Sequence, residues 1–384
     1  MSSKIKVLQV IPNLGHGGAE TGCYDLAHYL SEQGCKSYIA TSGGKLLKFV
    51  RKDKVKVIRL PVNSKNPILI ILNSLIISLI ILVLNINIVH ARSRAPAWSC
   101  LISCFLTRRK FVTTFHGTYS FSSEIKKFYN SVMVRSKLII AGSNFIFSHI
   151  NENYQKFLNA KNKLMVIFRG INLDYYNIQN ISEAKKKNLI KDWKIDFNKF
   201  IILLPGRLTE WKGQEMFVEA LNILREDYNK NNFQAIILGS NQGRKVYSKK
   251  LHSLVERYRM GNDIKFIDYC KDMPTGYSIA DVVVSSSIRP EAFGRVSVEA
   301  QAMKKLIIAS NIGGSRETIV DKKSGLLYKA GDPRELARTI NDAMELDKEI
   351  LHSMGNEGRK NVSKKFDVEK MCHTTFTEYQ KLLK

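Results

Sequence analysis

Short apolar runs alternate with longer stretches of mixed polarity along almost the whole chain. In the first half, the runs KIKVLQVI, SYIAT, VKVIRLP, INIVHA, KFVTTF and KLIIAG each have the length of a strand, and LMVIFRGINL closes the series. Runs rich in Val and Ile that are separated by helical stretches are typical of a parallel sheet covered on both faces. The first half is therefore predicted to be an α/β domain.

A polar, lysine-rich and poorly periodic stretch, DYYNIQNISEAKKKNLIKDWKIDFN, interrupts this alternation. The pattern restarts with FIILLPGR, FQAIILG, DIKFIDY, DVVVSSS, KLIIAS and SGLLYK, and the chain ends in helical sequence. We predict two Rossmann-like, doubly wound parallel-sheet domains facing a central cleft. The predicted parts are the domains 1–175 and 199–365, a connection over 176–198, and a C-terminal helix over 366–384.

Length and charge narrow the classes of partner. The 384 residues suffice for two domains, and the formal net charge of +26 favours acidic partners such as nucleotides or anionic lipid. A compositional bias toward Lys explains the charge equally well, and no Arg-rich tail or interleaved aromatic patch supports nucleic-acid binding. The six cysteines form no CxxC pair and the first residues do not resemble a signal peptide, so we expect a cytoplasmic protein.

The segment PILIILNSLIISLIILVLNINIV, residues 67–89, nearly reaches the length of a membrane span. Asn and Ser residues interrupt it, and Asn85 and Asn87 lie where a helix would give way to a strand. We predict a helix over 68–84 followed by the strand INIVHA. Such a helix is buried or docked on the surface, and attachment to one leaflet of a membrane remains an alternative.

Chemistry-bearing residues follow the predicted strands. After the first strand, PNLGHGGAE places Gly17 and Gly18 where the backbone can approach a ligand and a helix N-terminus can meet an anion, although a plain turn would look the same. In GRLTEWKGQE, Arg207 and Lys212 supply two cations suited to a diphosphate. His116 follows the strand KFVTTF, where a lone histidine is a candidate for substrate contact.

The stretch RPEAFGRVSVEAQAM carries two carboxylates on a loop and the helix after it. Glu291 lies on the loop, beside the backbone amides of Phe293, Gly294 and Arg295 at the predicted helix start. Glu299 lies more than one turn inside the helix, so the two acids are not an acid/base pair on one face. A carboxylate accepts hydrogen bonds from a vicinal diol, and we therefore expect one glutamate to face a sugar and the other a ribose.

Taken in order, these motifs resemble those of GT-B-fold retaining glycosyltransferases of family 4, also called glycosyltransferase group 1. The segments GGAE, FRGIN, GRLTEWKG, IADVVVSSS and SNIGGSRE fall in the family's order, and Glu291 and Glu299 fit its E-x7-E signature. The resemblance covers nearly the whole chain. ARSRAPAW and EAFGRVSVEAQAM look most similar to bacterial enzymes of lipopolysaccharide core or surface-glycan synthesis.

The resemblance implies a role for each matched residue. Glu299 would hold the donor ribose, and Glu291 with the amides near Phe293 and Gly294 would hold hydroxyls of the transferred sugar. Arg207 and Lys212 would neutralise the diphosphate, and Gly17 and Gly18 would approach that diphosphate from the other domain. His116 would contact the donor sugar. Arg295 stands where many relatives carry an apolar residue, and its expected role in donor binding is a contact with the acceptor or with phosphate.

The implied reaction is the transfer of a hexose from a nucleotide-diphosphate sugar with retention of anomeric configuration. No DxD sequence occurs in the chain, so neither a metal nor another cofactor is expected. The acceptor is predicted to be lipid-linked or lipopolysaccharide, with peripheral contact to the inner face of an anionic membrane. Two alternatives stay open: a soluble sugar acceptor, and a non-catalytic basic binding protein of the same fold.

Overall fold

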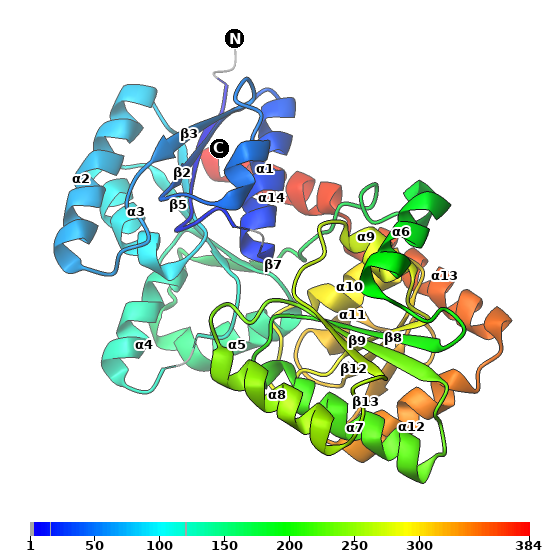
Figure 1. Cartoon of the computed structure of the whole chain (residues 1–384). Helices are drawn as coiled ribbons and strands as arrows, with labels where there is room; N and C mark the ends of the chain where they lie inside the picture. The colour runs from blue at the N-terminus through cyan, green and yellow to red at the C-terminus, as the bar shows by residue number, and fades with distance from the viewer. Residues whose placement is uncertain (1–3, 16, 120) are drawn as a thin grey trace. The chain divides into compact units, whose positions relative to one another are not determined.

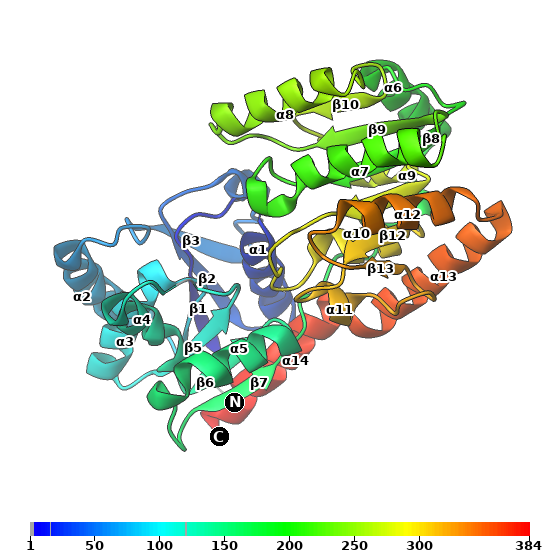
Figure 2. The ribbon, with the colours of Figure 1, turned by 90° about the horizontal axis from the view of Figure 1, so that it is seen from below.

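The computed structural model describes residues 4–15, 17–119 and 121–384, which divide into two compact units (Figure 1). The chain up to Gly170 together with Val368–Lys384 forms unit 1, and Ile171–Asp367 forms unit 2. Each unit is a parallel sheet with helices on its two faces, as the views in Figures 1 and 2 show. The predicted fold class, two Rossmann-like α/β domains, is confirmed.

In its described residues, unit 1 has a seven-stranded parallel sheet in the order β3-β2-β1-β4-β5-β6-β7. Val7 on the central strand pairs with Ser37 on one side and with Ile88 on the other. Its strands are β1 (Lys6–Val10), β2 (Lys36–Thr41), β3 (Val55–Arg59), β4 (Ile88–Ala91), β5 (Lys110–Phe115), β6 (Leu138–Ala141) and β7 (Lys163–Val166). Its helices are α1 (Gly18–Glu32), α2 (Pro67–Leu84), α3 (Arg94–Thr107), α4 (Glu124–Asn130), α5 (Asn144–Tyr154) and α14 (Val368–Leu383), with short 3-10 turns at Lys45–Phe49, Ser131–Val134 and Gln155–Phe157.

The segment that resembles a membrane span divides as predicted. Helix α2 ends at Leu84 because Asn85 adopts a left-handed conformation with φ 52°, which closes the last turn. Strand β4 then begins at Ile88. Helix α14 returns from the far end of the sequence to unit 1, where the Tyr379 hydroxyl lies 2.5 Å from Nδ1 of His90 in the sheet.

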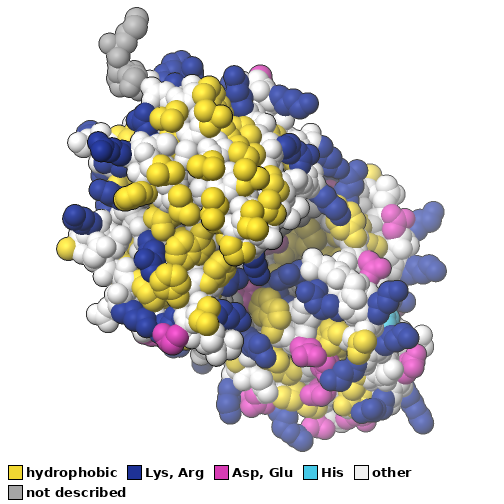
Figure 3. Space-filling view, turned by 90° about the vertical axis from the view of Figure 1, so that its left-hand side faces the viewer, with side chains coloured by type: hydrophobic (Ala, Val, Ile, Leu, Met, Phe, Trp, Pro, Cys, Tyr) yellow, Lys and Arg dark blue, Asp and Glu magenta, His cyan; other side chains and the backbone are white. Residues whose placement is uncertain are grey.

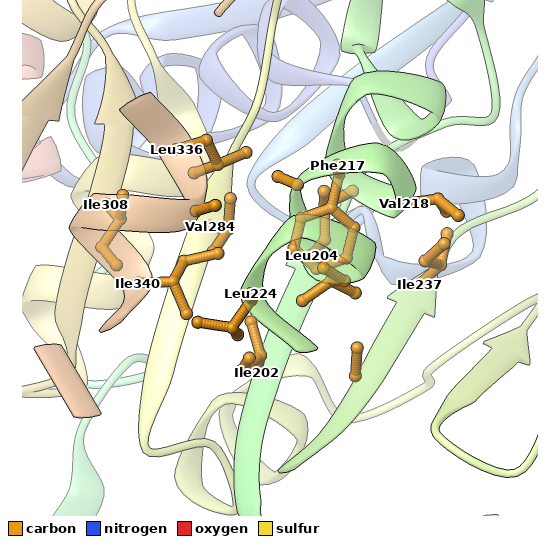
Figure 4. Close-up of a cluster of buried hydrophobic side chains, with 14 of the residues drawn as sticks. Ile202, Leu204, Phe217, Val218, Leu224, Ile237, Val284, Ile308, Leu336 and Ile340 are labelled. Atoms are coloured by element: carbon orange, nitrogen blue, oxygen red, sulfur yellow. The ribbon is translucent and has the colours of Figure 1, made fainter. Parts of the chain in front are cut away.

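Unit 2 has, over its described residues, a six-stranded parallel sheet in the order β10-β9-β8-β11-β12-β13. Its core packs Ile202, Leu204 and Ile237 of the sheet against Phe217 and Leu336 of the covering helices (Figure 4). The strands are β8 (Phe200–Pro205), β9 (Phe233–Leu238), β10 (Ile264–Ile267), β11 (Val282–Ser285), β12 (Leu306–Ser310) and β13 (Leu326–Tyr328). The helices are α6 (Glu183–Trp193), α7 (Gln214–Asp227), α8 (Lys245–Arg257), α9 (Met273–Ser278), α10 (Arg295–Ala302), α11 (Ser315–Thr318), α12 (Pro333–Met344) and α13 (Lys348–Lys365), with 3-10 turns η4 (Ile178–Asn180) and η5 (Glu210–Lys212).

Residues 176–198 differ from the expected connection. They carry η4 and α6, and they belong to unit 2. Trp193 at the end of α6 is buried, which ties this polar helix to the unit. The lysine-rich sequence is therefore the solvated face of a helix that packs through a few apolar residues.

Each sheet contains one point where the strand order reverses. In unit 1 the reversal lies between β1 and β4, and in unit 2 it lies between β8 and β11. Open parallel sheets bind ligands beyond the carboxyl ends of the strands at such a switch point. The segments that follow these four strands are therefore the places to look for a site.

Candidate active site

At the switch point of unit 2, the segment after β8 packs directly against the loop after β11. Gly213 has φ 72°, and a Cβ atom on it would lie 1.9 Å from the carbonyl oxygen of Ser286. The hydroxyl of Ser286 in turn donates to the carbonyl of Lys212 at 2.9 Å. Glycine is thus required here for the two segments to approach, and their approach brings Lys212 toward Glu291.

Lys212 and Glu291 form an ion pair across this junction. The Lys212 Nζ donates to Glu291 Oε1 at 2.7 Å, and the two side chains are 14% and 11% exposed. The hydroxyl of Ser287 donates to the same oxygen at 2.6 Å. Burial by itself raises the pKa of Glu291, but Lys212 and the serine hydroxyls outweigh it, so the net pKa lies below its usual value. Glu291 is therefore an ionised hydrogen-bond acceptor at neutral pH.

The loop that carries Glu291 is held by a second glycine-dependent contact. The Gly314 amide donates to the Glu291 carbonyl at 2.8 Å, and a Cβ on Gly313 would lie 2.6 Å from that same carbonyl oxygen. The glycine pair of SNIGGSRE thus lets two loops pack closely. The ring of Phe293 is buried and lies against that of Phe366, so this residue can offer a ligand only its backbone.

Glu299 lies on the second turn of α10, where three side chains surround it. Oε1 accepts from Arg295 Nε at 2.5 Å, and Oε2 accepts from the Tyr277 hydroxyl at 2.8 Å. Gly294, with φ 86°, caps the helix. Burial and then Glu299 raise the pKa values of Tyr277 and Tyr176 well above their usual range, so both tyrosines remain neutral donors. Sequence reasoning missed both tyrosines, because neither one follows a strand or belongs to a motif.

Arg207 is the most accessible of the predicted site residues in unit 2. Its side chain is exposed, and Nη1 lies 3.5 Å from Oε1 of Gln242, which is a long hydrogen bond. Its carbonyl accepts from Gln214 Nε2 at 2.9 Å, which fixes the backbone after β8. A guanidinium fixed at its base and open at its tip suits an incoming anion.

Unit 1 has a pocket of about 300 Å³ at its own switch point. The lining residues come after β1, β4 and β5 and from the first turn of α1, which is the arrangement the strand order predicts. They are Ile11, Pro12, Asn13, Ala19, Glu20, Arg92, Ser93, His116, Gly117, Thr118 and Tyr119. The lining of the pocket includes one carboxylate, that of Glu20, and one guanidinium, that of Arg92, together with the imidazole of His116.

The hydrogen bonds of His116 fix its tautomer. Arg169 Nη2 lies 2.6 Å from Nδ1 of His116 and 2.9 Å from its carbonyl oxygen. A guanidinium only donates, so Nδ1 accepts and the proton of the neutral ring is on Nε2. Burial and then Arg169 lower the pKa of His116 well below its usual value, so the ring is neutral. The buried Nε2 has no partner among the described residues, so its N–H is an unsatisfied hydrogen-bond donor in the wall of the pocket.

Gly17 and Gly18 begin α1 beside this pocket. Gly17 is the N-cap with φ −75°, a conformation open to any residue, and Gly18 is the first helical residue. A Cβ on Gly17 would lie 2.4 Å from Oε2 of Glu20, whose side chain folds back over the helix start. The small residue at 17 thus makes room for the Glu20 carboxylate.

The predicted site residues consequently fall into two sets. Gly17, Gly18 and His116 lie in unit 1, and the other seven lie in unit 2, where Lys212 meets Glu291 and Arg295 meets Glu299. Over residues 4–15, 17–119 and 121–384, no three His, Cys, Asp or Glu side chains are placed to hold a metal ion.

Comparison with known proteins identifies the family. A model described as "Glycosyl transferases group 1" matches residues 185–361, and one described as "Glycosyltransferase Family 4" matches residues 16–175. The chain belongs to this family of glycosyltransferases, and it uses a nucleotide sugar. Its similarity to lipopolysaccharide-core enzymes in particular is not confirmed.

Three relatives illustrate the range. A glycosyltransferase from Rickettsia africae is 36% identical, with a TM-score of 0.91 over 100% of this chain and 99% of the other. The crystal structure of HepE from Anabaena, which contains UDP and glucose, is 23% identical with a TM-score of 0.83 over 98% of this chain and 100% of the other. Spore coat protein SA of Bacillus subtilis is 25% identical over 304 residues, 77% of this chain and 78% of that protein.

Proposed function

We propose that the chain transfers a hexose from a nucleotide-diphosphate sugar to a lipid-borne acceptor with retention of anomeric configuration. The assignment of a nucleotide-sugar donor rests on the residues at the switch point of unit 2. There the exposed guanidinium of Arg207 and the largely buried ion pair between Lys212 and Glu291 follow the ends of β8 and β11. The presence of UDP and glucose in HepE, a protein of the same fold, supports a uridine nucleotide as the first donor to test.

The carboxylates have acceptor capacity left for a donor. A carboxylate offers about four lone-pair positions, and Glu299 uses one on each oxygen for Arg295 and Tyr277, with the Tyr176 hydroxyl as a third donor beside it. We assign the remaining capacity to a ribose hydroxyl. Lys212 and Ser287 both bond Oε1 of Glu291 and Ser285 is a further donor to this carboxylate, and we assign the remaining acceptor capacity of Oε2 to a hydroxyl of the transferred sugar.

The leaving diphosphate develops negative charge, which Arg207 and Lys212 would stabilise without a metal. An ammonium carries three N–H donors, so Lys212 can keep its bond to Glu291 and still donate to a phosphate oxygen. His116 would donate from Nε2 to a sugar hydroxyl, and its neutral state makes it a positioning donor. Since we assign no carboxylate nucleophile, we propose front-side attack assisted by the leaving phosphate.

Two measurements test this mechanism. Proton NMR of the first product formed from a nucleotide α-hexoside should show an α-linkage, and a β-linkage would contradict retention. Turnover should persist after exhaustive chelation with EDTA. A loss of turnover that added Mn²⁺ or Mg²⁺ restores would refute the metal-free assignment.

The acceptor half of the proposal rests on the outer face of α2. By length and composition this helix could cross a bilayer, and only 22% of it is buried. Figure 3 shows apolar side chains gathered on the side of unit 1 where α2 lies. The exposed side chains of this surface, which we call the α2 face, are Ile68, Ile71, Leu72, Leu75, Leu79, Leu82 and Val83 of α2 with Phe105 and Leu106 of α3.

Hydrogen bonds fix the inner side of α2 to unit 1. Ser103 Oγ of α3 donates to the Ser74 carbonyl at 2.8 Å, and Ser99 Oγ donates to the Ile70 carbonyl at 2.9 Å. Asn73 Nδ2 donates to the Pro61 carbonyl at 3.2 Å. A helix held in this way by its polar side, with its apolar side outward, fits a position along a membrane surface better than a span.

Charge around the α2 face favours an anionic bilayer. Between Asp53 and Glu124 the sequence contains no acidic residue, so nothing in this stretch repels anionic lipid. Juxtamembrane cations each add about 1 kcal/mol of attraction to an anionic surface. Apart from the buried Arg92, the stretch holds eight cations: Lys54, Lys56, Arg59, Lys65, Arg94, Arg108, Arg109 and Lys110. We therefore propose peripheral binding to the inner face of the cytoplasmic membrane, where a lipid-borne acceptor would be presented.

Vesicle flotation tests this proposal. The wild type should float with phosphatidylglycerol-containing vesicles and the double variant Leu75→Gln/Leu79→Gln should not. Val246→Gln is the matched control, because Val246 is an exposed apolar residue of α8 in unit 2. If the double variant floats as the wild type does, the α2 face is not the contact. A wild type that does not float favours a soluble acceptor, the second candidate.

A further inference from the structure

Arg92 stands out among the residues that line the pocket of unit 1. It follows β4 directly, at the switch point, in the ARSRAPAW motif. Its side chain is 5% exposed. Over the described parts of the chain, no hydrogen bond or ion pair holds its guanidinium, and Nε is buried without a partner.

Neighbouring arginines in unit 1 are paired, which sets Arg92 apart. Arg94 Nη1 donates to Asn130 Oδ1 at 2.8 Å and its guanidinium lies 4.1 Å from the ring centre of Tyr119. Arg169 holds His116. Glu20 lines the same pocket as Arg92, but no ion pair within 4.0 Å joins them.

Apart from the Glu20 carboxylate in the same pocket, the titratable groups packed around Arg92 are neutral. Nη2 lies 3.0 Å from where a Cβ on Gly22 would be, so the α1 backbone covers one side of the guanidinium. Burial lowers the pKa values of His90 and His116 well below their usual range, and it raises that of Cys23 to about 12. Burial likewise raises the pKa of Tyr379. A buried charge without a counter-charge is unfavourable, so its presence calls for an external partner.

We propose that Arg92 binds an anionic group, a phosphoryl or carboxyl, on a substrate that enters the unit 1 pocket. A guanidinium recognises either group through two parallel N–H donors. The Nε2–H of His116, in the same pocket, supplies a donor for an adjacent hydroxyl. The anion has two sources: the diphosphate of the donor, or an acidic substituent on the acceptor sugar. This binding site goes beyond the proposed transfer reaction and does not require turnover to be detected.

The test is thermal unfolding of the full chain and of Arg92→Met, at matched ionic strength in chloride, with inorganic phosphate, UDP or glucuronate. Arg59→Met is the matched control, because Arg59 is an exposed cation of the same sheet whose one hydrogen bond to the described residues goes to the Ser42 carbonyl. Without added anion, Arg92→Met should unfold no earlier than the wild type, since no partner is lost. Phosphate binding should weaken about tenfold or more in Arg92→Met and remain unchanged in Arg59→Met.

The other two probes identify the source of the anion. Loss of the UDP-induced shift in Arg92→Met assigns the site to the donor diphosphate, whereas loss of only the glucuronate or phosphate shift assigns it to the acceptor. The inference is overturned if no anion stabilises the wild type, if Arg92→Met keeps every shift, or if the variant is destabilised without ligand. Both binding patterns can be measured even if the protein does not transfer sugar. A negative result here therefore says nothing against the proposed transfer reaction, and the reverse also holds.

Discussion

Removing Lys212 should destabilise unit 2, because it leaves the Glu291 carboxylate buried with hydroxyl partners only. Breaking a buried ion pair from one side typically costs 3–5 kcal/mol. The pair is 14% and 11% exposed and Ser287 still donates to Glu291, so we place Lys212→Met at the lower end, about 3 kcal/mol. In a unit of the size of residues 171–367, each kcal/mol shifts the unfolding midpoint by about 2–4 °C, so the expected fall is about 6–12 °C.

Differential scanning calorimetry at pH 7 measures this fall. The double variant Lys212→Met/Glu291→Gln should recover most of the loss, because it removes the uncompensated charge. Lys360→Met is the control, since the Lys360–Glu357 pair of unit 2 is exposed on the Lys side and should cost less than about 1 kcal/mol. Lys212→Met with wild-type stability, or a double variant whose loss is the sum of the two single losses, would refute the reasoning.

The pH dependence gives an independent check of the same pair. The pKa of Glu291 is lowered in the folded state, so its contribution to stability is fully present above the unfolded-state pKa of about 4.3 and is lost as the pH falls through the folded pKa. Without Lys212, burial raises the pKa of Glu291, so the difference between wild type and Lys212→Met should shrink as the pH falls from the raised pKa of the variant through the lowered pKa of the wild type. Any activity loss in Lys212 variants has to be measured at a temperature where the variant is folded.

Three further predictions concern other parts of the site and its frame. Gly213→Ala should lower the unfolding temperature of unit 2 by several degrees more than Gly331→Ala does. Both glycines have positive φ, but only at Gly213 would a Cβ meet a backbone oxygen. Equal unfolding temperatures of the two variants in calorimetry would contradict this. Glu299→Gln should weaken UDP binding about tenfold in titration calorimetry, as expected for loss of charged hydrogen bonds, and an unchanged affinity would remove the ribose assignment. His90 has a pKa well below its usual value, so lowering the pH from about 6.5 to 5 should destabilise the wild type more than His90→Gln. The slope of this difference should steepen toward about 1.4 kcal/mol per pH unit, the limit for one proton. Denaturant midpoints that depend on pH equally in the two proteins would contradict this prediction.

The fold followed from the sequence because parallel strands buried on both faces leave a strong signal. Each run of Val and Ile predicted as a strand contains an observed strand, and Asn85 correctly marked the end of the apolar helix before β4. Residues 176–198 were harder to place. Their polar composition hid a helix that packs through Trp193 and a few neighbours, so low periodicity was taken for a connection.

The site was predictable only where a residue follows a strand. Arg207, Lys212, Glu291 and His116 were all chosen by that rule, and the structure places each of them after a strand of its own sheet. The partners of Glu299 were not found, since Tyr277 lies in a short helix with no motif around it.

The sequence also could not predict that the Arg92 guanidinium is buried without an ion-pair partner among the described residues. Its motif was noticed, but its burial and the lack of an ion pair to it over the described parts of the chain are properties of the folded neighbourhood and not of the sequence. Likewise, sequence suggested an acceptor or phosphate contact for Arg295 but not its partner in the protein, whereas the structure places its Nε 2.5 Å from the Glu299 carboxylate.

The most direct test of the central claim is thermal unfolding with UDP, GDP and ADP, carried out on the wild type and on Glu299→Ala. A diphosphate at about a hundred times its dissociation constant adds about 2.7 kcal/mol of stability. We predict that one nucleotide, UDP first, stabilises the wild type by this amount and that Glu299→Ala loses most of the effect. If none of the three stabilises the wild type, or if Glu299→Ala responds as the wild type does, the assignment of the donor site to unit 2 is contradicted.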